Sequence, residues 1–184
     1  MEQDIKEIIL TEEDIKTICK RLGEQITKDY AGKELLVVGF LRGCVPFLAE
    51  LIKHIKLPLE YDFMHLSSYS GTETTGTVKI KKDLSTDIKD LHVLIVEDIV
   101  DSGYTIQAVM PILAERQPAS IEVATLLDKP SGRKIENMNP KYVGYVVPNL
   151  FVVGFGLDYD SRYRNLPFVG VLKEEVYSRW NQLL

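Results

Sequence analysis

Apolar residues recur between Thr11 and Tyr30 with the spacing that an amphipathic helix needs. They stand three or four positions apart along most of the segment, at Ile15, Ile18, Cys19, Leu22 and Ile26. Thr11 can act as the N-cap, with Asp14 three residues later in a spacing close to a capping box, and Gly32 closes the segment. The pattern predicts a helix over residues 11–30.

The rest of the chain alternates between short apolar runs and amphipathic segments. The apolar runs predict strands at Glu34–Phe40, Leu59–Leu66, Leu91–Val96, Ser120–Leu127, Tyr142–Val147 and Val169–Leu172, with a further short stretch at Phe151–Gly156. Helices are expected at Cys44–Lys53 and Thr105–Arg116, where Pro111 marks a candidate kink. Residues 67–82 are rich in Ser, Gly and Thr and end in lysines, so a loop or a flexible hairpin is expected there.

Alternation of strands and helices predicts an α/β fold with a doubly wound, mainly parallel sheet that is flanked by helices. In such sheets ligands bind at the carboxyl ends of the strands. The chain shows no internal repeat, no low-complexity segment and no linker. We therefore expect a single domain over residues 1–184, with the N-terminal helix and the C-terminal tail as a small cap, or hood, from the chain ends.

Composition and charge narrow the classes of partner. The 184 residues are 45% hydrophobic and 27% charged, and the formal net charge is -5. This acidic balance argues against a nucleic-acid partner or an anionic membrane surface, because nucleic-acid binding needs a basic footprint. No apolar run approaches the ~20 residues of a membrane span. Residues 1–10 lack the basic start and long apolar stretch of a signal peptide, so a cytoplasmic location is expected.

The segment Val93–Thr105, VLIVEDIVDSGYT, carries the clearest chemical signal. An aliphatic strand runs into Glu97 and Asp98, a turn with Asp101, Ser102 and Gly103 follows, and a helix starts near Thr105. Backbone N–H groups of such a loop, together with the partial positive charge at the helix start, can bind a phosphate. The two acids at the strand's end can hold sugar hydroxyls or a hydrated Mg²⁺.

Acidic residues around a helix start also occur simply as caps, and composition alone leaves that alternative open. The order of apolar strand, two acids, two aliphatics, Asp, Ser-Gly and Thr is more specific, and it resembles the phosphoribosyl pyrophosphate motif of the type I phosphoribosyltransferases. The resemblance implies that phosphate and phosphoribosyl groups bind at Glu97, Asp98, Ile99, Val100, Asp101, Ser102, Gly103, Tyr104 and Thr105.

Between Leu35 and Val176 the chain resembles the hypoxanthine-guanine phosphoribosyltransferases. The resemblance implies that Arg42 and Gly43 bind pyrophosphate through a peptide bond that can be cis, with arginine where many members have lysine. It implies a pyrophosphate contact for Arg164 as well. Ser68 and Tyr69 match the start of a lid that closes over the site.

The resemblance also implies a purine site. Lys129 would recognise the 6-oxo group, Phe151 would stack on the base, and the backbone near Val152 would read its far edge. Asp158 would serve a second Mg²⁺, so the implied metal-binding residues are Glu97, Asp98 and Asp158. Taken singly, Lys129 is better explained as a loop lysine and Phe151 as a core aromatic, and a turn residue explains Asp158 equally well. Their joint order and spacing carry the resemblance.

The implied activity belongs to purine salvage. A 5-phosphoribosyl group would pass from phosphoribosyl pyrophosphate to hypoxanthine or guanine, with Asp101 as general base and Mg²⁺ as cofactor, in a homo-oligomer, either dimer or tetramer. Adenine is disfavoured because Lys129 can only donate a hydrogen bond. Two alternatives stay open: a xanthine-preferring purine phosphoribosyltransferase, and a regulatory protein that senses phosphoribosyl pyrophosphate.

Overall fold

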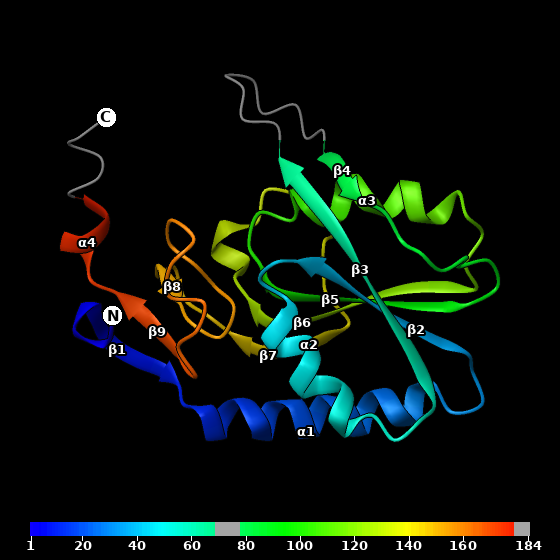
Figure 1. Ribbon diagram of the computed structural model, residues 1–184, viewed down its shortest axis with the longest axis horizontal. Coiled ribbons are helices and arrows are strands. Elements are labelled where there is room, and N and C mark those ends of the chain that lie inside the picture. The colour runs from blue at the N-terminus through cyan, green and yellow to red at the C-terminus, as the bar shows by residue number, and fades with distance from the viewer. Residues whose placement is uncertain (69–77, 179–184) are drawn as a thin grey trace.

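A computed structural model describes residues 1–68 and 78–178 (Figure 1). The α-helices are α1 Glu12–Asp29, α2 Val45–Leu51, α3 Tyr104–Ala114 and α4 Glu174–Ser178. The strands are β1 Ile5–Leu10, β2 Leu35–Leu41, β3 Leu59–Ser68, β4 Val78–Lys82, β5 His92–Val100, β6 Ser120–Asp128, β7 Tyr142–Val146, β8 Val152–Val153 and β9 Val169–Leu172. Short 3-10 helices cover Glu2–Asp4, Ile52–His54 and Pro130–Gly132.

The main sheet has the strand order β4-β3-β2-β5-β6-β7. Strands β3, β2, β5, β6 and β7 are parallel, and β4 pairs antiparallel with β3 at the edge. The chain moves from β2 outward to β3, then returns to the other side of β2 and continues through β5 to β6. Strands β2 and β5 therefore flank the topological switch point, where ligands bind in sheets of this kind.

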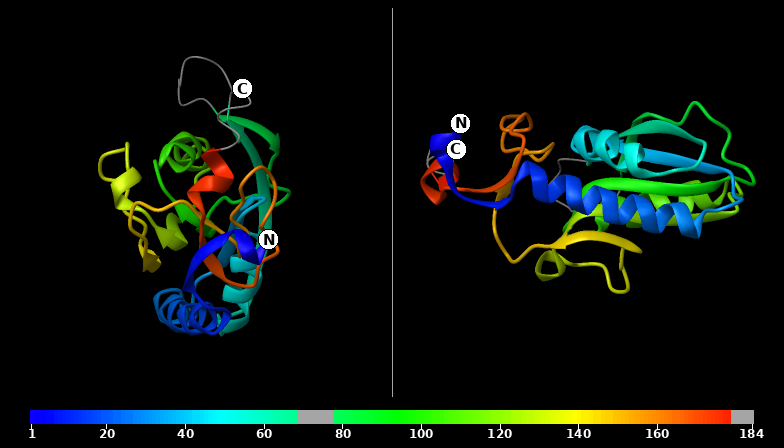
Figure 2. Two further views of the ribbon diagram at one scale, coloured as in Figure 1. Left: turned by 90° about the vertical axis from the view of Figure 1, so that its left-hand side faces the viewer. Right: turned by 90° about the horizontal axis from the view of Figure 1, so that it is seen from below.

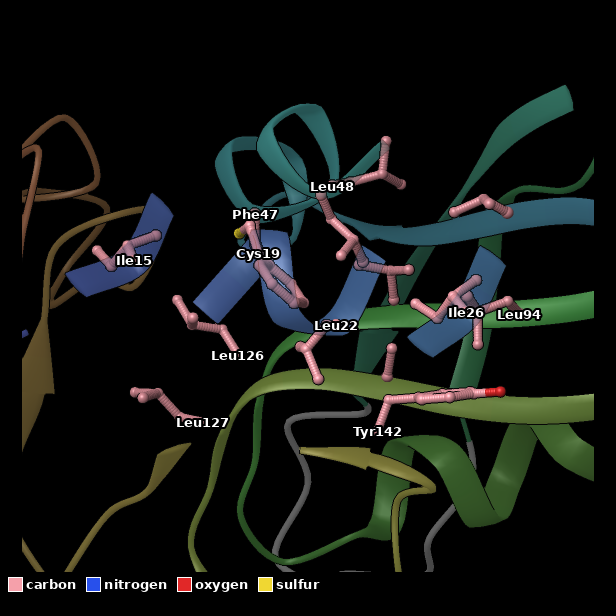
Figure 3. Close-up of a cluster of buried hydrophobic side chains, with 14 of the residues drawn as sticks. Ile15, Cys19, Leu22, Ile26, Phe47, Leu48, Leu94, Leu126, Leu127 and Tyr142 are labelled. Carbon is pink, nitrogen blue, oxygen red and sulfur yellow. The ribbon is translucent and has the colours of Figure 1, made fainter. Parts of the chain in front are cut away.

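Helices α1 and α2 cover one face of the main sheet (Figure 1). Figure 3 shows Leu22 and Ile26 of α1 and Phe47 of α2 packed with Leu94 and Tyr142 of the strands. Helix α1 begins with the expected capping box, in which the Asp14 N–H donates to the Thr11 hydroxyl and the Thr11 N–H donates to the Asp14 carboxylate. The hydrophobic period of α1 thus fixes which side of the helix meets the sheet.

Helix α3 covers the opposite face. Its residues Ile106, Val109 and Leu113 pack against a second cluster that includes Val93 and Ile95 of β5. Helix α3 continues through Pro111 to Ala114. Helices on both faces of a mainly parallel sheet confirm the doubly wound α/β class that the sequence predicts.

A small hood stands at one end of the molecule (Figure 2). It consists of the antiparallel sheet β1-β9-β8 with α4, and its core contains Val153, Tyr163, Leu166 and Leu172. Both chain ends contribute, as expected, but the N-terminal contribution is strand β1 rather than the helix of residues 11–30. That helix belongs to the core of the main domain, because its apolar face is buried against the sheet.

Both ends of the segment of residues 67–82 form β-strands. Strand β3 runs to Ser68, and Val78–Lys82 pairs antiparallel with it, so Ser68 lies opposite Val78. The hairpin alternative is therefore the better description of the two ends of this segment. Tyr69 lies outside the described residues.

Candidate active site

The predicted phosphate loop connects β5 to α3 at the switch point. Strand β5 runs to Val100, four residues beyond the predicted end at Val96, so Glu97 and Asp98 are strand residues. The turn that follows ends at Gly103, which has φ 87° and ψ -4°, a left-handed conformation that favours glycine. Gly103 is the N-cap of α3, and the Gln107 N–H donates to its carbonyl at 3.0 Å. The N-terminus of α3 therefore points its backbone N–H groups toward the same edge of the sheet.

The turn after β2 lies directly beside this loop. The Leu41–Arg42 peptide bond is cis, one bond earlier than the Arg42–Gly43 peptide. A methyl group on Gly43 would overlap the Asp98 carboxylate, so this turn touches β5 at close range. A cavity of about 180 Å³ is lined by Arg42, Gly43, Glu97, Asp98 and Thr105, among others. Residues predicted to bind pyrophosphate and phosphoribose thus share one cavity.

Burial disfavours the charged forms of the paired acids Glu97 and Asp98. Burial raises the pKa of Glu97 well above its usual value, and the neighbouring Asp98 charge raises it further. Burial also raises the pKa of Asp98; the Arg164 charge counteracts this rise, while Asp158 adds to it. Asp98 and Asp158 line the same cavity, and Arg164 pairs with Asp158, which explains why both charges act on Asp98.

The hood supplies Arg164 and Asp158. The guanidinium of Arg164 forms an ion pair with Asp158 at 2.7 Å and donates to the Gly156 carbonyl at 2.6 Å. Asp158 also accepts a hydrogen bond from the Ser161 N–H at 2.9 Å. A methyl group on Gly156 would overlap the Gly43 carbonyl, so this loop meets the turn after β2. The hood loop that carries Asp158 and Arg164 therefore contacts the turn that carries Arg42 and Gly43.

A second cavity, of about 230 Å³, is also lined by Asp98. Its lining contains the predicted purine-site residues together with the predicted base: Asp98, Ile99, Asp101, Lys129, Leu150, Phe151, Val152, Leu157 and Asp158. The Lys129 ammonium nitrogen is 3.5 Å from an Asp101 carboxylate oxygen. Phe151 lines this cavity with 41% of its surface exposed, so part of its ring is accessible to a ligand.

Comparisons with known proteins identify the family of this chain. A model of the phosphoribosyl transferase domain matches residues 6–160. The chain belongs to the phosphoribosyltransferase family. A curated Streptococcus pneumoniae protein named hypoxanthine-guanine phosphoribosyltransferase is 52% identical over 179 residues, which cover 97% of this chain and 99% of that protein. The chain therefore falls among the hypoxanthine-guanine phosphoribosyltransferases within the family.

Solved structures of family members have the same fold. A hypoxanthine phosphoribosyltransferase from Staphylococcus aureus is 53% identical, with a TM-score of 0.93 and 96% coverage of both chains. A hypoxanthine-guanine phosphoribosyltransferase from Bacillus anthracis is 40% identical, with a TM-score of 0.88 over 92% of this chain and 99% of that chain.

The carboxylates of the site suit Mg²⁺, which needs few protein ligands, better than a metal ion that protein side chains alone coordinate. Within residues 1–68 and 78–178, no three His, Cys, Asp or Glu side chains converge as a self-sufficient metal site. Mg²⁺ is usually held by one or two carboxylates, waters and substrate phosphates, and Asp98 beside Glu97 meets that requirement.

In the described residues, 1–68 and 78–178, no helix is long and apolar enough to cross a membrane.

Some residues around the purine-side cavity carry no signal in the sequence. A methyl group on Gly132 would overlap the Asp101 carboxylate, and Leu150 and Leu157 line the cavity. Arg133 forms an ion pair with Asp128, the last residue of β6, and so closes the turn that carries Lys129. The sequence signal for this ion pair is the opposite charge of Asp128 and Arg133, which stand on either side of Lys129.

Proposed function

We propose that this chain transfers the 5-phosphoribosyl group of phosphoribosyl pyrophosphate to hypoxanthine or guanine, giving IMP or GMP and pyrophosphate in purine salvage. The observation that carries the proposal is the purine-side cavity, where a donor-only lysine, an acceptor carboxylate and an exposed aromatic ring meet. This cavity shares Asp98 with the cavity beside the phosphate loop. A base and an activated sugar could therefore occupy adjoining spaces.

The sugar and its phosphates would be bound at the carboxyl ends of β2 and β5. The 5-phosphate would accept hydrogen bonds from backbone N–H groups between Ser102 and Thr105, where the start of α3 favours negative charge. Glu97 and Asp98 would face the ribose hydroxyls. Arg42, the Gly43 backbone and Arg164 would bind the pyrophosphate, whose charge two guanidinium groups can offset.

The base would be read by donors and by stacking. Lys129 would donate to the purine 6-oxo group, Phe151 would stack on the ring, and the backbone near Val152 would meet the far edge. The amino group of adenine would place a donor against the Lys129 donor, which disfavours that base. Xanthine carries the same 6-oxo group, so Lys129 alone does not discriminate against it.

In the reaction, the bond from ribose C1 to pyrophosphate breaks and a bond from C1 to the purine nitrogen forms. The transition state of such a glycosyl transfer resembles an oxocarbenium ion. Asp101 would accept the proton of purine N7 as the base adds, and Lys129 would stabilise negative charge on O6. Arg42 and Arg164 would stabilise the negative charge of the departing pyrophosphate.

Glu97, Asp98 and Asp158 are the residues that would hold Mg²⁺. When bound, the cation supplies charge neutralisation for the pyrophosphate oxygens. Ser68 ends β3, where it pairs with Val78 of the edge strand β4. The lid role of Ser68 and Tyr69 stays a prediction. The cytoplasmic location and the homo-oligomeric state also stay predictions.

Pyrophosphate release tests the proposal. Purified protein with Mg²⁺ and phosphoribosyl pyrophosphate is given hypoxanthine, guanine, xanthine or adenine, and the nucleotide product is identified by mass. We expect release with hypoxanthine and guanine and little with adenine. Binding of phosphoribosyl pyrophosphate without release for any base would favour the sensing protein, and release mainly with xanthine would favour a xanthine-preferring enzyme.

A further inference from the structure

The ring of Phe151 is held between other aromatic side chains. Tyr177 of α4 stacks on it with ring centroids 5.0 Å apart and an interplanar angle of 25°. Tyr159 meets it edge to face, with centroids 5.6 Å apart and an angle of 86°. Both geometries are favourable for aromatic pairs.

Tyr177 stacks on one face of the Phe151 ring without lining the purine-side cavity itself. Phe151 lines this cavity and remains 41% exposed although Tyr177 lies against one of its faces. Among the described residues, those that line the cavity include Phe151 but not Tyr177. A ring has two faces, so the face that Tyr177 does not cover is the one available to a ligand in the cavity.

Helix α4 is attached to the hood, so Tyr177 has a fixed support. Val176 and Tyr177 pack against the hood core that contains Val153 and Leu172. Lys173, just before α4, donates from its backbone N–H to the Asp4 carbonyl at 2.9 Å and from its ammonium group to the Gln3 carbonyl at 2.7 Å. The position of Tyr177 thus depends on contacts between the two ends of the chain.

We propose that Tyr177 is a positioning residue for base binding, which fixes the plane of the Phe151 ring before the purine arrives. This inference rests on the proposed function, in which Phe151 stacks on the base. An exposed aromatic side chain would otherwise lose rotational freedom when the base binds, and a ring that is already held loses less. The C-terminal helix is in this way coupled to the affinity for the purine, while the phosphate loop is independent of it.

Three substitutions separate stacking from general stability. Tyr177→Ala removes the ring, Tyr177→Phe keeps it, and Val176→Ala removes a neighbouring hood contact without touching the Phe151 stack. For Tyr177→Ala we expect the KM for hypoxanthine and guanine to rise about three- to tenfold, the range that one aromatic pair supplies. The KM for phosphoribosyl pyrophosphate and kcat should stay near wild type. Tyr177→Phe should resemble wild type, and Val176→Ala should lower only the melting temperature.

Two results would overturn the inference. One is a base KM within twofold of wild type in a folded Tyr177→Ala protein; the other is a lower base KM, which would mean that Tyr177 competes with the base. If the wild-type protein releases no pyrophosphate, the proposed function fails separately, and calorimetric titration of hypoxanthine into the same variants replaces the KM. Unchanged hypoxanthine affinity in Tyr177→Ala, or no binding by wild type, then contradicts the role of Tyr177.

Discussion

Lys129 and Asp101 lie side by side because β5 and β6 are parallel and in register. Val100 pairs with Asp128, and the Lys129 N–H donates to the Val100 carbonyl at 3.0 Å. The residue that follows each strand carries a charge, and the two charged groups approach to 3.5 Å. A donor and an acceptor for one planar ligand are thus positioned by backbone pairing rather than by flexible loops.

Replacing Lys129 with Ala should reduce selectivity for 6-oxopurines. Without Lys129, the purine 6-oxo group loses its hydrogen-bond partner, which costs about 1–3 kcal/mol of binding free energy. The preference for hypoxanthine and guanine over adenine should therefore fall by one to two orders of magnitude. The measurement is kcat/KM for the three bases. Lys134→Ala is the matched control, because Lys134 is an exposed lysine on the same segment and should behave as wild type. Equal selectivity in the two variants would remove Lys129 from the purine site.

Replacing Gly43 with Ala should impair catalysis through geometry. The added methyl group overlaps the Asp98 carboxylate, so either the turn after β2 or Asp98 must move. A displacement near 1 Å in an active site can cost about 10²-fold in rate, and we expect kcat/KM to fall by that order. Val45→Ala, at an exposed position two residues later, should leave the rate unchanged. Wild-type kinetics for Gly43→Ala would show that the close approach is unimportant.

Replacing Arg133 with Met should destabilise the protein more than replacing Arg116 with Met. The Arg133–Asp128 pair is only 14% exposed on each side, whereas the Arg116–Asp83 pair is 31% and 47% exposed. Removing one partner of a buried pair costs about 3–5 kcal/mol, while an exposed pair contributes about 1 kcal/mol or less. Chemical denaturation of both variants measures the difference. Equal free energies of unfolding would mean that solvent screens the Asp128 carboxylate well.

The sequence predicted the main domain well because its elements have strong local signals. The hydrophobic period of α1 and its capping box involve residues that are close in sequence. Strands β2, β5 and β6 are continuous aliphatic runs, as expected for strands that are buried on both faces. Strand β1 was not predicted. It has six residues, is mostly exposed and pairs with β9 through two register shifts, so its sequence shows neither alternation nor a continuous buried run.

The sequence predicts which residues belong to the candidate site, but it does not predict the contacts between them. Arg164 reaches Asp158 because the intervening loop turns back through left-handed residues, Asp160, Ser161 and Tyr163, which no short pattern encodes. The contact of Gly43 with Asp98 joins strands that are 50 residues apart in sequence and adjacent in the sheet. Such contacts follow from strand order, which local periodicity does not specify.

Turnover of an Asp101→Asn variant tests the account most directly. Asn has nearly the shape of Asp and caps a turn equally well, but it cannot accept the purine proton. General-base catalysis typically contributes ~10²–10⁴-fold, so kcat should fall by that factor while the affinity for phosphoribosyl pyrophosphate and the melting temperature stay near wild type. Near-normal turnover in the folded Asp101→Asn protein would contradict the account, because Asp101 would then support the loop without taking part in the chemistry.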